Sequence, residues 1–127
     1  DQMGLYRDDL SRLGMLSNEA LRTARLVVDP GIHQFNWSRE QAIEYLKSHT
    51  ALDDKIIEGE VDRYIALPGQ ATSYMLGKRE IESLRDLAKR QLKDHFSIQE
   101  FHEVVLKDGA VTLPMLRRNV VQWIQSK

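Results

Sequence analysis

Three residues with the chemistry of a catalytic site are spaced four apart in this sequence: Arg25, Asp29 and His33. In a continuous helix this spacing places a guanidinium group, a carboxylate and an imidazole on one line. Ion pairs that tie neighbouring helices together are the more common reason for such a row. The alternative is the wall of a cleft, in which Asp29 orients or charges the His33 ring. The spacing alone leaves both interpretations open.

A second group of reactive side chains surrounds a predicted turn at Pro68 and Gly69. Arg63 and Tyr64 precede this turn, and Gln70 and Tyr74 follow it. The helix that begins after the turn adds free backbone N–H donors and a partial positive charge, so the corner suits an anion. In the competing interpretation both tyrosines are core residues with a hydrated hydroxyl, and Arg63 belongs to a surface ion pair.

No complete metal or nucleotide motif accompanies these residues. His102 and Glu103 begin like the zinc motif HExxH, but Leu106 stands where the second imidazole is required. We therefore assign no metal ligand in this chain and interpret His102 as structural. Gly69 and Gly77 are too far apart for a phosphate-binding loop.

The composition describes one ordinary folded domain, which we expect to span residues 1–127. The chain has 18 Lys or Arg, 19 Asp or Glu and no Cys. This even balance of charge argues against nucleic acid as a partner. No apolar stretch approaches the roughly 18 residues of a membrane span.

The pattern of apolar residues predicts an all-α fold, an irregular array of about six to seven helices with short connections and no sheet. We expect Gly14 to end a short first helix and Ser17 to cap the next. Pro30 should kink the second helix or end it near Val28 or Asp29, which makes its continuation to His33 uncertain.

Later helix starts carry capping signals. Ser38 and Ser97, with Gln41 and Glu100 three residues on, match the capping box, and Asp53 is a third N-cap. The last helix should open at Thr112, with Pro114 in its first turn. Between them, the longest helix has a seam of helically spaced residues from Tyr74 to Ala88, typical of packing along a partner.

Several separated blocks of the sequence resemble the C-terminal signature of a bacterial family, domain of unknown function 885. The blocks cover residues 22–33, 37–42, 60–65, 68–71 and 101–106, in the order and spacing of the family. One departure is Pro30, where the family usually has Thr, and it affects the helix that leads to His33.

The resemblance implies a larger protein than this chain. Family members look like helical zinc metallopeptidases with the HExxH motif and a further Glu ligand, all N-terminal to a stretch like this one. The chain would then be a C-terminal segment that forms one wall of the substrate cleft and is inactive alone. Its partner would be the N-terminal part of its own parent chain, zinc would be the cofactor of the full-length protein, and the substrate would be peptide-like.

Combined with residue chemistry, the resemblance also suggests roles for seven side chains. Candidate donors to the oxyanion of the reaction are His33, Tyr64 and Tyr74. Candidates for binding the substrate are Arg63, through a carboxylate, and Gln70, through the peptide backbone. Arg25 and Asp29 would orient these groups.

An interaction module is the competing prediction for the whole chain. A free-standing helical module without catalytic activity would dock through the seam of residues 74–88 or through the face around Trp123. A severed segment would instead expose the face meant for its missing half and form homo-oligomers. The resemblance favours a periplasmic or lipoprotein-anchored parent over a cytoplasmic one.

Overall fold

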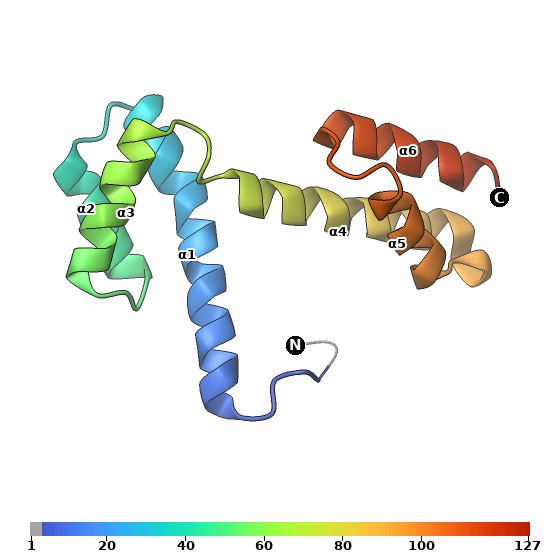
Figure 1. The fold of residues 1–127 in the computed structure, drawn as a ribbon, viewed down its shortest axis with the longest axis horizontal. Coiled ribbons are helices and arrows are strands. Elements are labelled where there is room, and N and C mark those ends of the chain that lie inside the picture. The colour runs from blue at the N-terminus through green and yellow to red at the C-terminus, as the bar shows by residue number, and fades with distance from the viewer. Residues whose placement is uncertain (1–3) are drawn as a thin grey trace. The chain divides into compact units, whose positions relative to one another are not determined.

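The computed structural model describes residues 4–127, and this part of the chain consists of helices without a strand (Figure 1). The helices are α1 (Asp9–His33), α2 (Arg39–His49), α3 (Asp54–Ala66), α4 (Ser73–Leu92), α5 (Ile98–Leu106) and α6 (Leu113–Gln125), with a short 3-10 turn at Lys93–His95. The predicted all-α class is confirmed. The contacts group into two compact units, Asp1–Met75 and Leu76–Lys127. The single domain expected over residues 1–127 stays a prediction.

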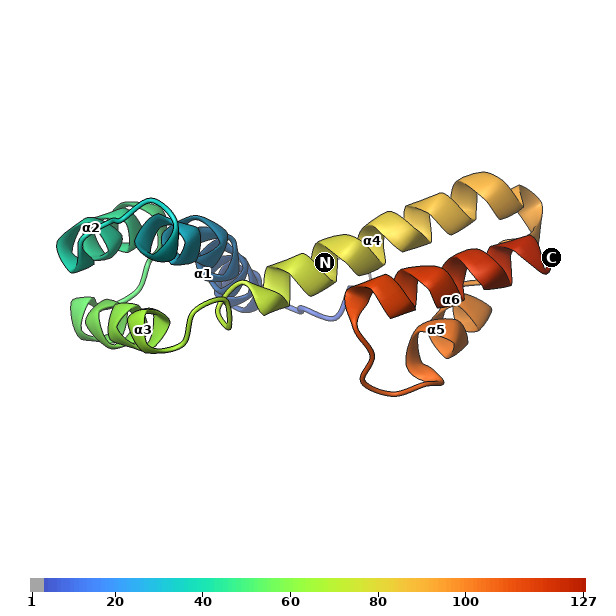
Figure 2. The same cartoon turned by 90° about the horizontal axis from the view of Figure 1, so that it is seen from above.

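The first unit is a bundle in which α2 and α3 lie side by side and both contact α1 (Figure 2). Its core is closed by side chains from all three helices, among which are Val28, Leu46, Ile57, Val61 and Tyr64, all without exposed surface. The bundle therefore gathers the second half of α1, the whole of α2 and α3, and the turn that follows them around one apolar centre.

Helix α1 is continuous where the sequence predicted two helices. Its N-cap is Asp8, whose carboxylate accepts a hydrogen bond of 2.7 Å from the backbone N–H of Ser11. Gly14 and Ser17 lie inside the helix, so the predicted break at Gly14 and the cap at Ser17 are wrong. A single glycine costs a helix only about 1 kcal/mol, which a good cap upstream and packing downstream outweigh.

The same helix continues through Pro30 to His33, so of the two predicted alternatives the end near Val28 or Asp29 is wrong, and the kink stays a prediction. Proline removes one backbone donor, but its own carbonyl accepts hydrogen bonds from Gln34 at 2.8 Å and Phe35 at 3.1 Å. The helix end is also held from outside, because the Trp37 N–H donates to the carbonyl of residue 31 at 2.8 Å.

The predicted starts of α2, α3 and α6 are confirmed. Ser38 Oγ accepts from the Gln41 N–H at 3.2 Å, and the Gln41 side chain accepts from the Ser38 N–H at 2.8 Å, which completes the capping box. Asp53 caps α3, and Thr112 precedes α6 with Pro114 in its first turn. Capping depends on neighbours in sequence, so these signals are legible without tertiary information.

In the second unit, the last part of α4 packs with α5 and α6. The buried side chains of its core include Leu84, Ala88, Phe101, Leu116 and Val120. The capping box predicted for α5 is half formed: Ser97 Oγ accepts from the Glu100 N–H at 3.4 Å, whereas the Glu100 carboxylate contacts Lys127 Nζ at 2.6 Å. The competing ion pair diverts the glutamate from its cap.

The predicted seam of α4 is buried only toward its C-terminal end. Leu84 and Ala88 have no exposed surface, whereas Tyr74 and Ile81 are exposed. Across residues 4–127, no helix combines the length and the apolar composition that crossing a lipid bilayer requires.

Candidate functional site

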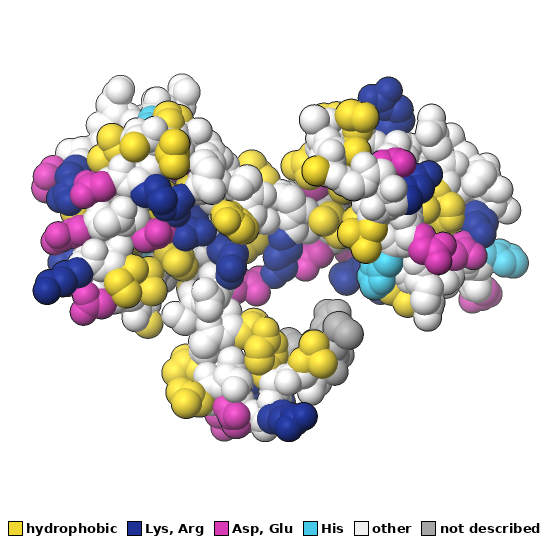
Figure 3. All heavy atoms as spheres, in the orientation of Figure 1, with side chains coloured by type: hydrophobic (Ala, Val, Ile, Leu, Met, Phe, Trp, Pro, Cys, Tyr) yellow, Lys and Arg dark blue, Asp and Glu magenta, His cyan; other side chains and the backbone are white. Residues whose placement is uncertain are grey.

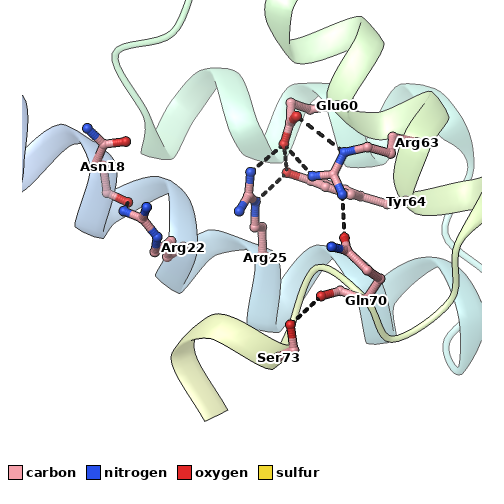
Figure 4. Close-up of polar contacts among 8 residues, drawn as sticks. All are labelled: Asn18, Arg22, Arg25, Glu60, Arg63, Tyr64, Gln70 and Ser73. Carbon is pink, nitrogen blue, oxygen red and sulfur yellow. Dashed lines mark hydrogen bonds and ion pairs between the residues drawn. The ribbon is translucent and has the colours of Figure 1, made fainter. Parts of the chain in front are cut away.

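The candidate residues of α1 and α3 meet at one carboxylate, that of Glu60 on α3 (Figure 4). One Glu60 oxygen accepts hydrogen bonds from Arg25 Nη2 at 2.7 Å, from Arg63 Nη2 at 2.9 Å and from the Tyr64 hydroxyl at 2.5 Å. Arg63 also donates to the Gln70 side chain. We call Arg25, Glu60, Arg63, Tyr64 and Gln70 the Glu60 cluster.

The Glu60 cluster holds its carboxylate in the ionised form. Burial alone would raise the pKa of Glu60, but hydrogen bonds from Arg63, Tyr64 and Arg25 outweigh it and lower the pKa to about 2. For the phenol the net shift is upward: burial and the hydrogen bond to Glu60 both raise the pKa of Tyr64, to about 12. Near neutral pH, Glu60 is therefore an anion and Tyr64 a neutral donor.

Tyr64 is fully buried, and its hydroxyl lies between two charged groups. It donates to Glu60 and accepts from Arg25 Nε at 2.9 Å. Burial lowers the pKa of Arg25, but the hydrogen bonds to Tyr64 and Glu60 raise it by more, so the guanidinium stays charged. The phenol thus bridges α1 and α3 as part of the bundle.

Asp29 fastens the turn after α3 to α1. Its carboxylate is 5% exposed, and its two oxygens lie 3.1 and 3.0 Å from the backbone nitrogen of Gly69, which donates to them. Gly69 has a φ of +78°, a conformation that glycine adopts without strain. Asp29 therefore determines where the chain turns toward Gln70 and Tyr74.

His33 contacts the end of α3 with its ring. Its Nε2 lies 2.9 Å from the backbone carbonyl oxygen of Tyr64, and since a carbonyl only accepts, Nε2 carries the proton and donates. Tyr64 contributes one of the last four carbonyls of its helix, which need partners from outside.

Tyr74 lies on the exposed side of this region. Its side chain is 52% exposed, and the guanidinium carbons of Arg22 and Arg25 each lie 5.7 Å from its ring centroid. No hydrogen bond of its hydroxyl is found within residues 4–127. Tyr74 is thus the accessible phenol, in contrast to the enclosed Tyr64.

The structure connects five of the seven predicted residues through their side chains and links the other two, Asp29 and His33, to the backbone of Gly69 and of Tyr64. Within residues 4–127, no hydrogen bond or ion pair joins Arg25, Asp29 and His33 to one another. Each side chain instead reaches a different group on α3 or on the following turn. The row therefore ties neighbouring elements together, while the catalytic roles assigned to it stay predictions.

The chain is similar to known proteins. A family model described as "Bacterial protein of unknown function (DUF885)" matches residues 1–120. The chain belongs to the DUF885 family. The predicted resemblance is confirmed, and the zinc peptidase character that it implied stays a prediction. A search of the curated proteins found no match.

A solved structure shares the fold of this DUF885 chain. It is described as "The crystal structure of the putative lipoprotein from Colwellia psychrerythraea", with a TM-score of 0.95 and 46% sequence identity. The match covers 99% of this chain and 22% of the other, so the chain spans about a fifth of the length of that relative.

The sequence analysis missed Glu60, the centre of the cluster. Its signal is local: Glu60 precedes Arg63 by three residues and Tyr64 by four, the spacings at which side chains meet on a helix. A carboxylate at that spacing from two candidate residues could have been singled out. Its bond to Arg25 joins residues 35 apart in sequence and has no local signal.

No part of the described chain is suited to hold the zinc that the family resemblance implies. Within residues 4–127, no three His, Cys, Asp or Glu side chains come together as a metal site. The donors of the Glu60 cluster and of Tyr74 are guanidinium groups, an amide and phenols.

Proposed function

We propose that this DUF885 chain is the C-terminal segment of a zinc-dependent, peptidase-like hydrolase and that its Glu60 cluster belongs to one wall of the substrate cleft. The observation that carries the proposal is the cluster itself. An ionised, partly buried carboxylate fixes two arginines and a phenol, beside the exposed ring of Tyr74. Rigidly held donors of this kind stabilise negative charge that develops in a reaction.

Tyr74 is the best candidate for the oxyanion donor. The hydroxyl proton of Tyr64 is already donated to Glu60, and the Nε2 proton of His33 to a carbonyl. We therefore give Tyr64 and His33 positioning roles in this proposal. The hydroxyl of Tyr74 remains available to a substrate carbonyl.

Arg63 and Gln70 would contact the substrate next to this phenol. Their mutual hydrogen bond uses the carbonyl oxygen of the Gln70 amide, so its NH₂ group remains as a donor to a peptide carbonyl. Asp29 and Arg25 would act through position, by fixing the turn and the cluster. The zinc ligands belong, in this proposal, to the preceding part of the parent chain.

A lipid-anchored parent in the cell envelope fits the name of the Colwellia relative, and we propose that location. The alternative function is a helical interaction module. It is favoured by the apolar side of α1, where Leu10, Leu13 and Leu16 are well exposed. A cleft wall uses the same surface for contact with its own parent chain.

The test uses the full-length protein, its metal content and its hydrolysis of a defined peptide mixture, followed by mass spectrometry. We expect bound zinc and cleavage, and we expect Tyr74→Phe to lower kcat by about 100-fold with little change in KM, the usual loss for one oxyanion donor. Tyr45→Phe, on α2, is the matched control and should leave kcat unchanged.

An unchanged kcat in Tyr74→Phe would remove Tyr74 from the proposed machinery. A full-length protein that binds zinc but cleaves no peptide would contradict the hydrolase and favour the interaction module.

A further inference from the structure

We infer that the substrate ends in a free carboxylate, which Arg22 and Arg25 bind beside Tyr74. This rests on the proposed function and deepens it: the hydrolase would act on the C-terminal end of peptides. Three observations carry the inference: an arginine without a carboxylate partner, two nearby carboxylates that are engaged by other donors, and an aromatic ring that holds two guanidinium groups at an exposed position.

Arg22 is the arginine without a carboxylate partner. Its contacts within residues 4–127 are the backbone oxygen of Asn18, at 3.4 Å, and the ring of Tyr74. Other arginines of this unit have carboxylates: Arg25 and Arg63 contact Glu60, and Arg39 contacts Asp62 at 2.6 Å. Most of the donor groups of Arg22 are therefore available to a ligand.

Two carboxylates of this region, those of Glu60 and Asp29, are already engaged by other donors. A third carboxylate, that of Glu19, stands three residues before Arg22 on α1. Glu60 is saturated by three donors, and both Asp29 oxygens are directed at the Gly69 N–H. Lys and Arg side chains also gather on this face of the first unit in Figure 3. An anion would relieve the repulsion between these like charges.

The ring of Tyr74 packs against the guanidinium groups of both Arg22 and Arg25. Arg22 and Arg25 lie on α1 three residues apart, and both pack against one ring, with each guanidinium carbon 5.7 Å from the centroid. A ring attracts cations without neutralising them or using their in-plane N–H donors. The site is thus built from the planar fork of Arg22 and the remaining donor nitrogen of Arg25, both held against one exposed ring, a set that matches a carboxylate.

Arg25 is also held in place by hydrogen bonds to side chains of α3. Its Nε and Nη2 are used by Tyr64 and Glu60, which leaves Nη1 as its remaining donor nitrogen. Its side chain is largely buried, so the charge is held at one place. A preformed donor loses little conformational freedom when a ligand binds.

The experiment compares three peptides of one sequence in the full-length protein: the free acid, the C-terminal amide, and an amide with Asp as its last residue. We expect kcat/KM for the free acid to exceed that for both amides by about 10-fold or more, the usual worth of a charge-assisted hydrogen bond. Calorimetric binding of an acetylated dipeptide acid, compared with its amide, should show the same preference without turnover.

Arg22→Gln should remove most of this preference through KM, and Arg22→Lys, which keeps the charge and loses the planar fork, should retain part of it. Arg39→Gln removes a charge from the same unit at a distance from Tyr74 and should change nothing; circular dichroism checks that each variant is folded.

The outcomes separate the two levels of the proposal. Equal cleavage of acid and amide would overturn the carboxylate site while leaving the hydrolase intact. A preference for the Asp-terminated amide as strong as for the acid would overturn recognition of the chain end. A preference that survives Arg22→Gln would overturn the role of Arg22, and cleavage of none of the peptides would defeat the proposed function together with this inference.

Discussion

The replacement of Glu60 by glutamine tests whether one ionised carboxylate organises the first unit. Glu60→Gln keeps the size of the side chain and removes the charge that Arg25, Arg63 and Tyr64 share. The pKa of Glu60 is lowered from 4.5 to about 2. At about 1.4 kcal/mol per pKa unit, ionisation stabilises the fold by at most about 3.5 kcal/mol, and partial exposure to solvent brings the expected loss to about 1–2 kcal/mol at pH 7.

The expected loss depends on pH in a defined direction. Because the pKa of Glu60 is lower in the folded chain, its stabilisation is complete well above pH 4.5 and disappears as the pH falls from 4.5 toward 2. Roughly half of the difference between the wild-type chain and Glu60→Gln should be gone by pH 3.

The assay is urea unfolding at pH 7 and at pH 3, followed by the fluorescence of Trp37 in a Trp123→Phe background, so that the signal reports on the first unit. Glu58→Gln, an exposed neighbour on the same helix, is the matched control and should change the free energy of unfolding little at either pH. An equal loss for Glu60→Gln at both pH values would refute the reasoning, because an ionised anchor must weaken on acidification.

Two further predictions concern the fold around the cluster. Gly31→Ala should destabilise the chain by about 1–3 kcal/mol, because its new methyl group would lie 2.6 Å from the Trp37 ring. Gly14→Ala is the control in the same helix, because no atom lies within 4 Å of the added carbon. It should stabilise the chain by about 0.5–1 kcal/mol. A rise in Tm for both variants would contradict the close contact between residue 31 and the Trp37 ring. Asp29→Ala leaves the Gly69 N–H without its acceptor and should cost about 1–3 kcal/mol in urea unfolding; no measurable loss would mean that the turn is held by other contacts.

The sequence predicted the parts of the fold that depend on near neighbours. The caps at Ser38 and Asp53 are local hydrogen bonds, Pro114 stands in the first turn after Thr112, and the three helices begin where expected. Gly14 and Pro30 misled because their costs, about 1 and about 3 kcal/mol, are local and can be outweighed by tertiary contacts. The contacts that outweigh them, such as the packing of Trp37 against residue 31, join segments that only the folded chain brings together.

The sequence predicted which residues belong to the candidate site, but not which hydrogen bonds connect them. Charged and phenolic side chains at helical spacing indicated where to look, and Arg63 and Tyr64 do lie together. The sequence had no means of showing that Asp29 bonds to Gly69, 40 residues later, or that His33 bonds to a backbone carbonyl. These links cross between elements, and they determine which candidates still have a free donor.

The first half of α1 exposes its leucines to solvent, and this affects how often the helical turns of that half open. Leu10, Leu13 and Leu16 remain well exposed, whereas the second half of the helix packs into the bundle through Ala24 and Val28. An isolated helical stretch of a dozen residues is marginal in water, so its turns open and close many times for each opening of the packed half. The two halves of this continuous helix therefore open at different rates, and any surface that covers the leucines would make the first half open less often.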